Sequence, residues 1–140
     1  MIRLTLISSV ALLAACASND DNTISSMNYL QAPIEAACAR DALIDEEGFA
    51  AVTSIRQIGG AEQIDATFNQ DMPVTVIVRR QDDGTGEVSV FTRLEEGATP
   101  LERRKANFAV TTADETIYRQ CTADGKINPG DADVIIEAQE

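Results

Sequence analysis

The spacing of apolar residues in the first third of the chain is that of a helix. Four apolar residues fall on one helical face between residues 30 and 47: Ile34, Ala37, Cys38 and Ala42. Pro33 near the first turn and Gly48 just after the end are typical of helix boundaries. The pattern predicts a helix over residues 30–47 with the Cys38 side chain in the core.

After Gly48 the pattern changes to short segments rich in β-branched residues and separated by turn residues. The sequence predicts strands over residues 51–58, 63–68, 73–80, 87–92, 107–112 and 115–122. Residues 81–86 contain two glycines that can adopt positive φ, which predicts a hairpin turn. The charged residues 101–106 are expected to form one helical turn. Val134, Ile135 and Ile136 could add a short edge strand or fray.

Together these elements predict an α+β domain over residues 29–140, in which one N-terminal helix packs on an antiparallel sheet of four to six strands. The chain of 140 residues is long enough for one domain with one modest core. We find no internal repeat and expect no second domain.

The first fifteen residues have the order of an export signal. Arg3 precedes a mainly apolar stretch from Leu4 to Leu13, and two small residues, Ala14 and Ala15, follow it. A stretch of about ten residues is roughly half of what a helix needs to cross the hydrocarbon core. We therefore expect residues 1–15 to be cleaved and not to span the membrane permanently.

The end of this signal, Leu13-Ala14-Ala15-Cys16, resembles the lipobox of bacterial lipoproteins. The resemblance implies cleavage after Ala15, a diacylglyceryl thioether on Cys16 and acylation of the new amino terminus. Two or more acyl chains suffice for stable attachment to a bilayer. Ala17 stands where an aspartate often signals retention at the inner membrane, so the resemblance favours the outer membrane and its periplasmic face. The alternative is an ordinary cleaved signal.

The residues after Cys16 are small and polar up to Ser26, which is typical of a flexible tether. We expect residues 16–28 to be disordered and to hold the domain away from the membrane.

The net charge of −12 at pH 7 limits the classes of partner. So acidic a chain is a poor partner for nucleic acid and for anionic lipid surfaces, whereas a cationic peptide, protein or metal ion remains permitted. Aromatic residues make up 4% of the chain and tryptophan is absent, which argues against a stacking platform for bases or sugars. Solubility alone is the simpler explanation of the charge.

Two cysteines remain once Cys16 is assigned to lipid, and an exported protein meets an oxidising compartment. We expect Cys38 and Cys121 to form a disulfide that joins the helix to the last long strand. A redox or nucleophilic thiol is the alternative, but the chain has neither a C-x-x-C motif nor a histidine to serve as a base.

The search for catalytic chemistry gives mainly exclusions. Without histidine, the Ser-His-Asp and Cys-His arrangements and the zinc motifs that use histidine are absent. A pair of carboxylates could still catalyse hydrolysis, but nothing marks two of the 23 acidic residues as special. Arg103-Arg104-Lys105 is the one basic cluster, and we expect acidic neighbours to neutralise it.

Two local resemblances bear on function. Asp124-Gly125-Lys126-Ile127-Asn128 with Asp131 resembles the second half of an EF-hand or dockerin calcium loop, although Gln120 and Thr122 stand where early oxygen ligands belong. We expect residues 123–126 to be a hairpin turn, with Asp124 and Asp131 the calcium candidates.

The second resemblance covers residues 34–91. This segment contains Asp82-x-x-Thr85-Gly86-Glu87-Val88, which is similar to the D-x-x-T-G-x-V ending of PepSY domains, modules associated with inhibiting or regulating peptidases.

The function expected from the sequence is that of a non-catalytic binding or envelope-organising module. It would be a lipoprotein held to the outer membrane by the lipid on Cys16, with a possible envelope protein as partner, no nucleic acid and no cofactor other than the covalent lipid. The alternatives are a PepSY-like peptidase inhibitor or regulator and a carboxylate-based enzyme.

Overall fold

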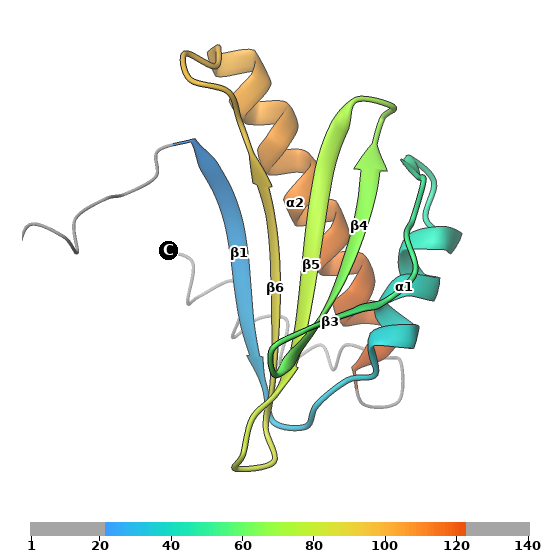
Figure 1. Cartoon of the computed structure of the whole chain (residues 1–140). Coiled ribbons are helices and arrows are strands. Elements are labelled where there is room, and N and C mark those ends of the chain that lie inside the picture. The colour runs from blue at the N-terminus through green and yellow to red at the C-terminus, as the bar shows by residue number, and fades with distance from the viewer. Residues whose placement is uncertain (1–21, 123–140) are drawn as a thin grey trace, which may run out of the picture.

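The computed structural model describes residues 22–122, which form a six-stranded antiparallel sheet and two helices (Figure 1). In chain order the elements are β1 (Thr23–Leu30), α1 (Ala36–Asp45), β2 (Phe49–Ala50), β3 (Arg56–Ile58), β4 (Ala61–Phe68), β5 (Met72–Arg80), β6 (Gly86–Arg93) and α2 (Pro100–Cys121). The α+β class and the antiparallel sheet are confirmed. The prediction of a single N-terminal helix is wrong, because the longer of the two helices follows the sheet.

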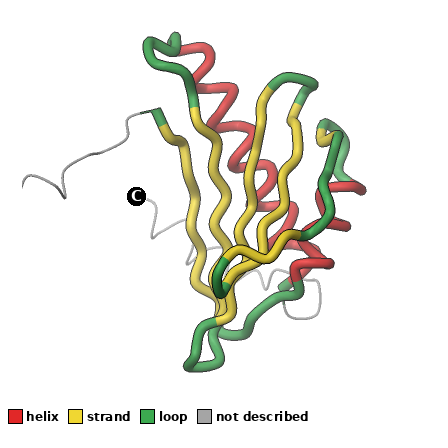
Figure 2. Tube along the Cα trace, in the orientation of Figure 1, coloured by secondary structure: helices red, strands yellow, loops and turns green. Residues whose placement is uncertain are grey.

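The strand order is β1-β6-β5-β4-β2, and β3 also pairs with β4. Strands β4, β5 and β6 follow one another as hairpins, and every pair is antiparallel (Figure 2). The segment that contains α1 carries the chain from β1 at one edge to β2 at the other, so that β6 returns beside β1. The β1–β6 pairing is continuous from Thr23↔Arg93 to Leu30↔Gly86.

The hydrophobic core lies between one face of the sheet and the helices. Alternate residues of a strand point to the same face, and one such set from each long central strand is buried. The buried set comprises Ile64, Ala66, Phe68, Val74, Val76, Val78, Val88, Val90 and Thr92. Helix α2 lies behind the sheet in Figure 1 and contacts β1, β5 and β6, while α1 contacts α2, β2 and β4.

Helix α1 is shorter than the sequence predicts and buries a different face. It begins at Ala36 instead of residue 30, since Ala32 and Pro33 lie in a loop packed against the backbone at Gly86. Its buried residues are Ala36, Ala39, Ala42 and Leu43. Ala37 is exposed and Cys38 is only partly buried. The buried face of the helix is therefore turned about the helix axis relative to the face that the sequence predicts.

Helix α2 replaces two predicted strands and one predicted helical turn. Its N-terminus has a capping box, in which the Glu102 backbone N–H donates to the Thr99 hydroxyl and the Thr99 backbone N–H donates to Glu102. The buried residues of α2 repeat at helical spacing: Ala106, Ala109, Val110, Ala113, Thr116 and Ile117. This periodic burial and the cap outweigh the strand preference of the β-branched residues among them.

The other corrections concern strands. Residues 23–28, which the sequence assigns to a disordered tether, belong to β1 and pair with β6. The single strand predicted over residues 51–58 is instead β3 preceded by an irregular stretch, since Ala51 has a positive φ of 50° after the two-residue β2. No helix within residues 22–122 is long and apolar enough to cross a membrane.

Candidate functional site

One face of the sheet carries no helix among residues 22–122 (Figure 1). We call it the open face, and it is formed by the odd-numbered residues of the long strands, which alternate with the buried set. These residues are Ser25, Met27 and Tyr29 of β1, Glu87, Ser89 and Phe91 of β6, Thr75, Ile77 and Arg79 of β5, and Gln63 and Asp65 of β4.

Asp65 is the centre of a polar network on the open face. Its carboxylate accepts hydrogen bonds from Arg56 Nη2 at 2.8 Å, from Thr75 Oγ1 at 2.8 Å and from Gln63 Nε2 at 3.1 Å. The Thr53 backbone N–H also donates to the Asp65 carbonyl at 2.8 Å. The network therefore holds the irregular stretch before β3 against β4, which is a structural role.

Glu87 is a second carboxylate on the open face, and it already has ion-pair and hydrogen-bond partners. Its side chain is 10% exposed and forms an ion pair with Arg79 at 3.5 Å. Gln81 Nε2 donates to the same carboxylate at 2.9 Å. These partners compensate for the burial of the charge.

The two carboxylates are too far apart to act as a catalytic pair. The register Asp65↔Thr75↔Phe91 places Asp65 and Glu87 two strand spacings apart across the sheet and four residues apart along it. Their separation is therefore about 16 Å. Glycoside hydrolases place their two carboxyl groups no more than about 9.5 Å apart.

Strand β1 forms one edge of the sheet, and its outer side faces no other strand among residues 22–122. Natural edge strands are usually protected by charged residues, proline, bulges or short length. The eight residues of β1, Thr-Ile-Ser-Ser-Met-Asn-Tyr-Leu, include neither charge nor proline, and their register with β6 has no bulge. Met27 is 53% exposed and Tyr29 is 73% exposed. We call the outer side of the Ile24–Leu30 backbone, which pairs with no strand among residues 22–122, the β1 edge.

Asp114 of α2 fixes β1 from the helix side. Its carboxylate accepts hydrogen bonds from the Asn28 side-chain amide and from Ser26. Burial raises the pKa of Asp114, and the hydrogen bonds from Asn28 and Ser26 only partly oppose this shift. The strand is thus held from α2 as well as from β6, so its backbone is already extended for pairing.

The cavity between β1 and α2 is too small for a ligand. It is lined by residues that include Asn28, Leu30, Asp114 and Tyr118, and its volume is about 10 Å³. That volume admits about one water molecule, whereas small-molecule pockets occupy several hundred Å³.

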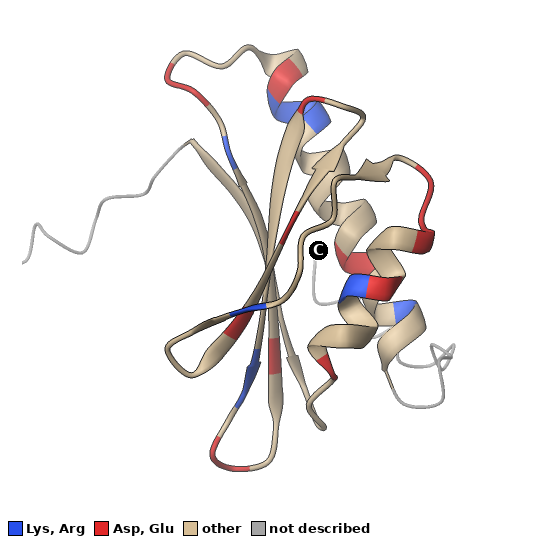
Figure 3. Ribbon diagram, turned by 45° about the vertical axis from the view of Figure 1, so that its right-hand side comes forward, with Lys and Arg blue, Asp and Glu red and all other residues tan. Residues whose placement is uncertain are grey.

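Acidic residues lie beyond both ends of the β1 edge (Figure 3). At the first end, the Leu94 backbone N–H donates to the Asn22 carbonyl at 2.6 Å, so the loop with Glu95 and Glu96 starts beside β1. At the other end, Leu30 pairs with Gly86, and the preceding β5–β6 turn carries Asp82 and Asp83. All four carboxylates are exposed.

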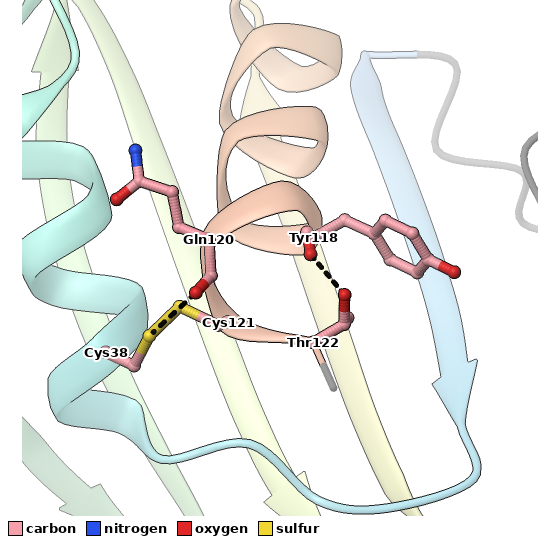
Figure 4. Close-up of a disulfide and its surroundings, with 5 residues drawn as sticks. All are labelled: Cys38, Tyr118, Gln120, Cys121 and Thr122. Atoms are coloured by element: carbon pink, nitrogen blue, oxygen red, sulfur yellow. Dashed lines mark hydrogen bonds between the residues drawn. A yellow bond between two sulfur atoms is a disulfide. The ribbon is translucent and has the colours of Figure 1, made fainter. Parts of the chain in front are cut away.

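The two cysteines predicted to pair lie at disulfide distance. The Cys38 and Cys121 Cα atoms are 5.8 Å apart, and a disulfide joins them (Figure 4). The bond links α1 to the last residue of α2, and not to a strand as the sequence predicts.

Three other predicted site residues lie outside the described residues: Cys16 and the calcium candidates Asp124 and Asp131. Within residues 22–122, no three acidic or cysteine side chains are grouped closely enough to hold a metal ion. The basic cluster begins in the first turns of α2, where Arg104 and Lys105 are exposed.

The PepSY-like ending has local structural roles here. Asp83 accepts hydrogen bonds from the Thr85 backbone N–H at 2.9 Å and from its hydroxyl at 2.6 Å, which closes the turn. A Cβ on Gly86 would lie 2.6 Å from Pro33 Cα, so only glycine permits the close approach of the α1 loop. These contacts explain Thr85 and Gly86 without a partner.

Sequence reasoning missed the β1 edge because Ser, Thr and Asn dominate its composition. The available signal was the alternation of Ile24, Ser26, Asn28 and Leu30 with Met27 and Tyr29, which is weak over so short a segment.

Comparison with known proteins gives no relative: no protein-family model, curated protein or solved structure matches the chain. The lipoprotein and PepSY resemblances therefore stay predictions, and the site has to be interpreted from its own geometry.

Proposed function

We propose that this chain is a non-catalytic binding module, anchored by lipid on Cys16 to the periplasmic face of the outer membrane, that docks an extended segment of another envelope protein on the β1 edge. The observation that carries the proposal is an unprotected, uncharged edge strand whose own Met27 and Tyr29 side chains are exposed. Strand addition to such an edge supplies affinity through main-chain hydrogen bonds.

An enzyme is less well supported by the same surface. Asp65 and Glu87 already have donors and cationic partners and lie about 16 Å apart on the open face. A catalytic carboxylate needs a substrate beside it, and the described cavity admits about one water molecule.

Site-specific photo-cross-linking in intact cells tests the binding role. A photoreactive amino acid at Met27 or Tyr29 should give reproducible cross-links to the same protein. Ile44 of α1 is a matched control, since it is 49% exposed and lies on a helix away from β1. If Ile44 captures the same neighbours as Met27, or if Met27 captures none, the docking role is wrong.

The anchor has its own test. Cys16→Ser removes the thiol that would carry the lipid, so the domain should leave the membrane fraction and keep its circular dichroism spectrum. Metabolic labelling with a fatty acid should be lost at the same time. Lipid labelling of the Cys16→Ser variant would disprove the assignment.

A further inference from the structure

We infer that the segment docked on the β1 edge has an uncharged middle and basic residues at both ends, and that it adds to the sheet as a strand beyond β1. The inference rests on the proposed function and specifies its partner. Three features of the described residues support it: the length of the edge, the apolar side chains beside it and the charges at its ends.

The length of β1 sets the length of the middle. The residues of β1 pair with β6 in one continuous register, so the opposite side of the Ile24–Leu30 backbone can pair over seven residues. Seven residues lie within the usual length of strands. Asp114 holds Asn28 and Ser26 from α2, so pairing requires little reordering of β1.

The exposed side chains of β1 favour an uncharged middle. Residues of an added strand would alternate between the open face and the α2 side. On the open face they would lie beside Met27 and Tyr29, whose exposed apolar surface is covered best by apolar or β-branched residues. A charged residue there would gain no partner from β1, which has no charge.

The ends of the edge favour cations. Glu95 and Glu96 lie beyond the Thr23 end, and Asp82 and Asp83 lie beyond the Leu30 end. The arginines of the neighbouring strands are already engaged, since Arg79 pairs with Glu87, Arg80 pairs with Glu35, and Arg93 lies 6.0 Å from the Phe91 ring centroid. Lysine or arginine just outside the paired region would meet an acidic pair at each end.

The same charges disfavour a second copy of this chain as the occupant. Antiparallel pairing of two β1 strands would bring the end of one copy that has Glu95 and Glu96 toward the end of the other that has Asp82 and Asp83, at both ends of the contact. The net charge of −12 on each chain adds long-range repulsion.

The test uses the full mature chain and synthetic peptides of about ten residues. The probe has alternating valine and threonine in the middle and two lysines at each end, and its dissociation constant is measured by fluorescence anisotropy. Methyl groups on alternate backbone nitrogens remove one row of hydrogen-bond donors and keep every charge, so this peptide should bind at least about tenfold more weakly. Glutamates in place of the lysines should weaken binding by at least as much.

Matched variants locate the site. Glu95→Lys with Glu96→Lys should weaken binding of the lysine peptide by about tenfold or more. Asp45→Lys with Glu47→Lys makes the same change in net charge at exposed positions at and just after the end of α1 and should have little effect. Equal loss in both variants would mean that the peptide responds only to net charge, which would refute the inference.

Several other results of these binding experiments would refute the inference. Equal binding of the N-methylated peptide would refute strand addition, and equal binding of the glutamate peptide would refute the basic ends. Absence of binding at about millimolar peptide or a stable dimer at neutral pH would overturn the inference. If cross-links from Met27 persist in any of these cases, the proposed function stands and only the partner's chemistry is wrong.

Discussion

Three carboxylates of the domain have different surroundings and therefore different roles. Asp65 and Glu87 on the open face have arginine partners, so their charge is compensated. Asp114 has amide and hydroxyl donors but no ion pair with a basic residue within residues 22–122, and it is partly buried. Burial therefore disfavours the charged form of Asp114.

The pKa of Asp114 gives a prediction about stability against pH. Burial raises this pKa above its ordinary value of 3.8, so the folded protein holds the proton at pH values where the unfolded chain has lost it. The contribution of Asp114 to stability is fully present below the unfolded pKa and is lost as pH rises through the folded pKa. Asp114→Asn keeps an acceptor for Asn28 and removes this loss, so the variant should gain stability relative to wild type as pH rises.

The measurement is urea unfolding of both proteins from about pH 3 to pH 7. The difference in unfolding free energy, variant minus wild type, should be larger at pH 7 than at pH 3. Asp71→Asn, in the exposed β4–β5 turn, controls for the loss of one negative charge. A difference that stays constant with pH, or that falls as pH rises, would contradict the role given to Asp114.

At the scale of elements, the sequence predicted best those that local chemistry defines. Strands β5 and β6 and the turn between them were placed within about one residue, because alternating β-branched residues and two glycines define a hairpin. Helix α2 was missed because its β-branched residues each favour a strand when they are considered individually: Val110, Thr111, Thr112 and Ile117. Only their spacing with Ala106, Ala109 and Ala113 gives the helical period.

The element that carries the candidate site could not be predicted for a different reason. The residues of β1 have no strong strand pattern of their own, and the strand forms because β6 offers it a partner distant in sequence. Such pairing depends on the tertiary fold more than on local propensity. The disulfide was predictable, since it follows from counting cysteines once Cys16 is assigned to lipid.

The disulfide between α1 and α2 should contribute a large part of the stability. It closes a loop with a sequence separation of 83 residues, for which the chain-entropy model gives about 4.5 kcal/mol. Replacing Cys38 and Cys121 together with serine should lower the unfolding free energy by about 2 to 4.5 kcal/mol, measured by urea denaturation.

Wild-type protein treated with a reductant is the control, because it loses the bond without a change of side chain. Its stability should fall to near that of the double variant. A loss below about 1 kcal/mol in both would show that the bond does not constrain the unfolded chain as the entropy model requires.

At the scale of the whole molecule, charge is distributed unevenly between the sheet and its surroundings. Acidic residues lie mainly on the helices and loops, whereas four arginines lie on strands, namely Arg56, Arg79, Arg80 and Arg93 (Figure 3). Strand β1 has no charge at all. The repulsion that keeps copies apart therefore comes from the periphery, and the edge itself has no protection of its own.

This distribution predicts self-association when the repulsion is weakened. The protein should be monomeric at neutral pH and low salt, and it should associate near its isoelectric point of about 4.3 or at about 1 M salt, where charges are screened within about 3 Å. Sedimentation velocity measures both states.

Met27→Lys places a charge on the β1 edge strand and should suppress the association. Leu101→Lys is the matched control, because Leu101 of α2 has the same 53% exposure as Met27. If Leu101→Lys suppresses association as strongly as Met27→Lys, the contact does not involve β1, and the same experiment would remove the reason for treating that strand as the docking edge.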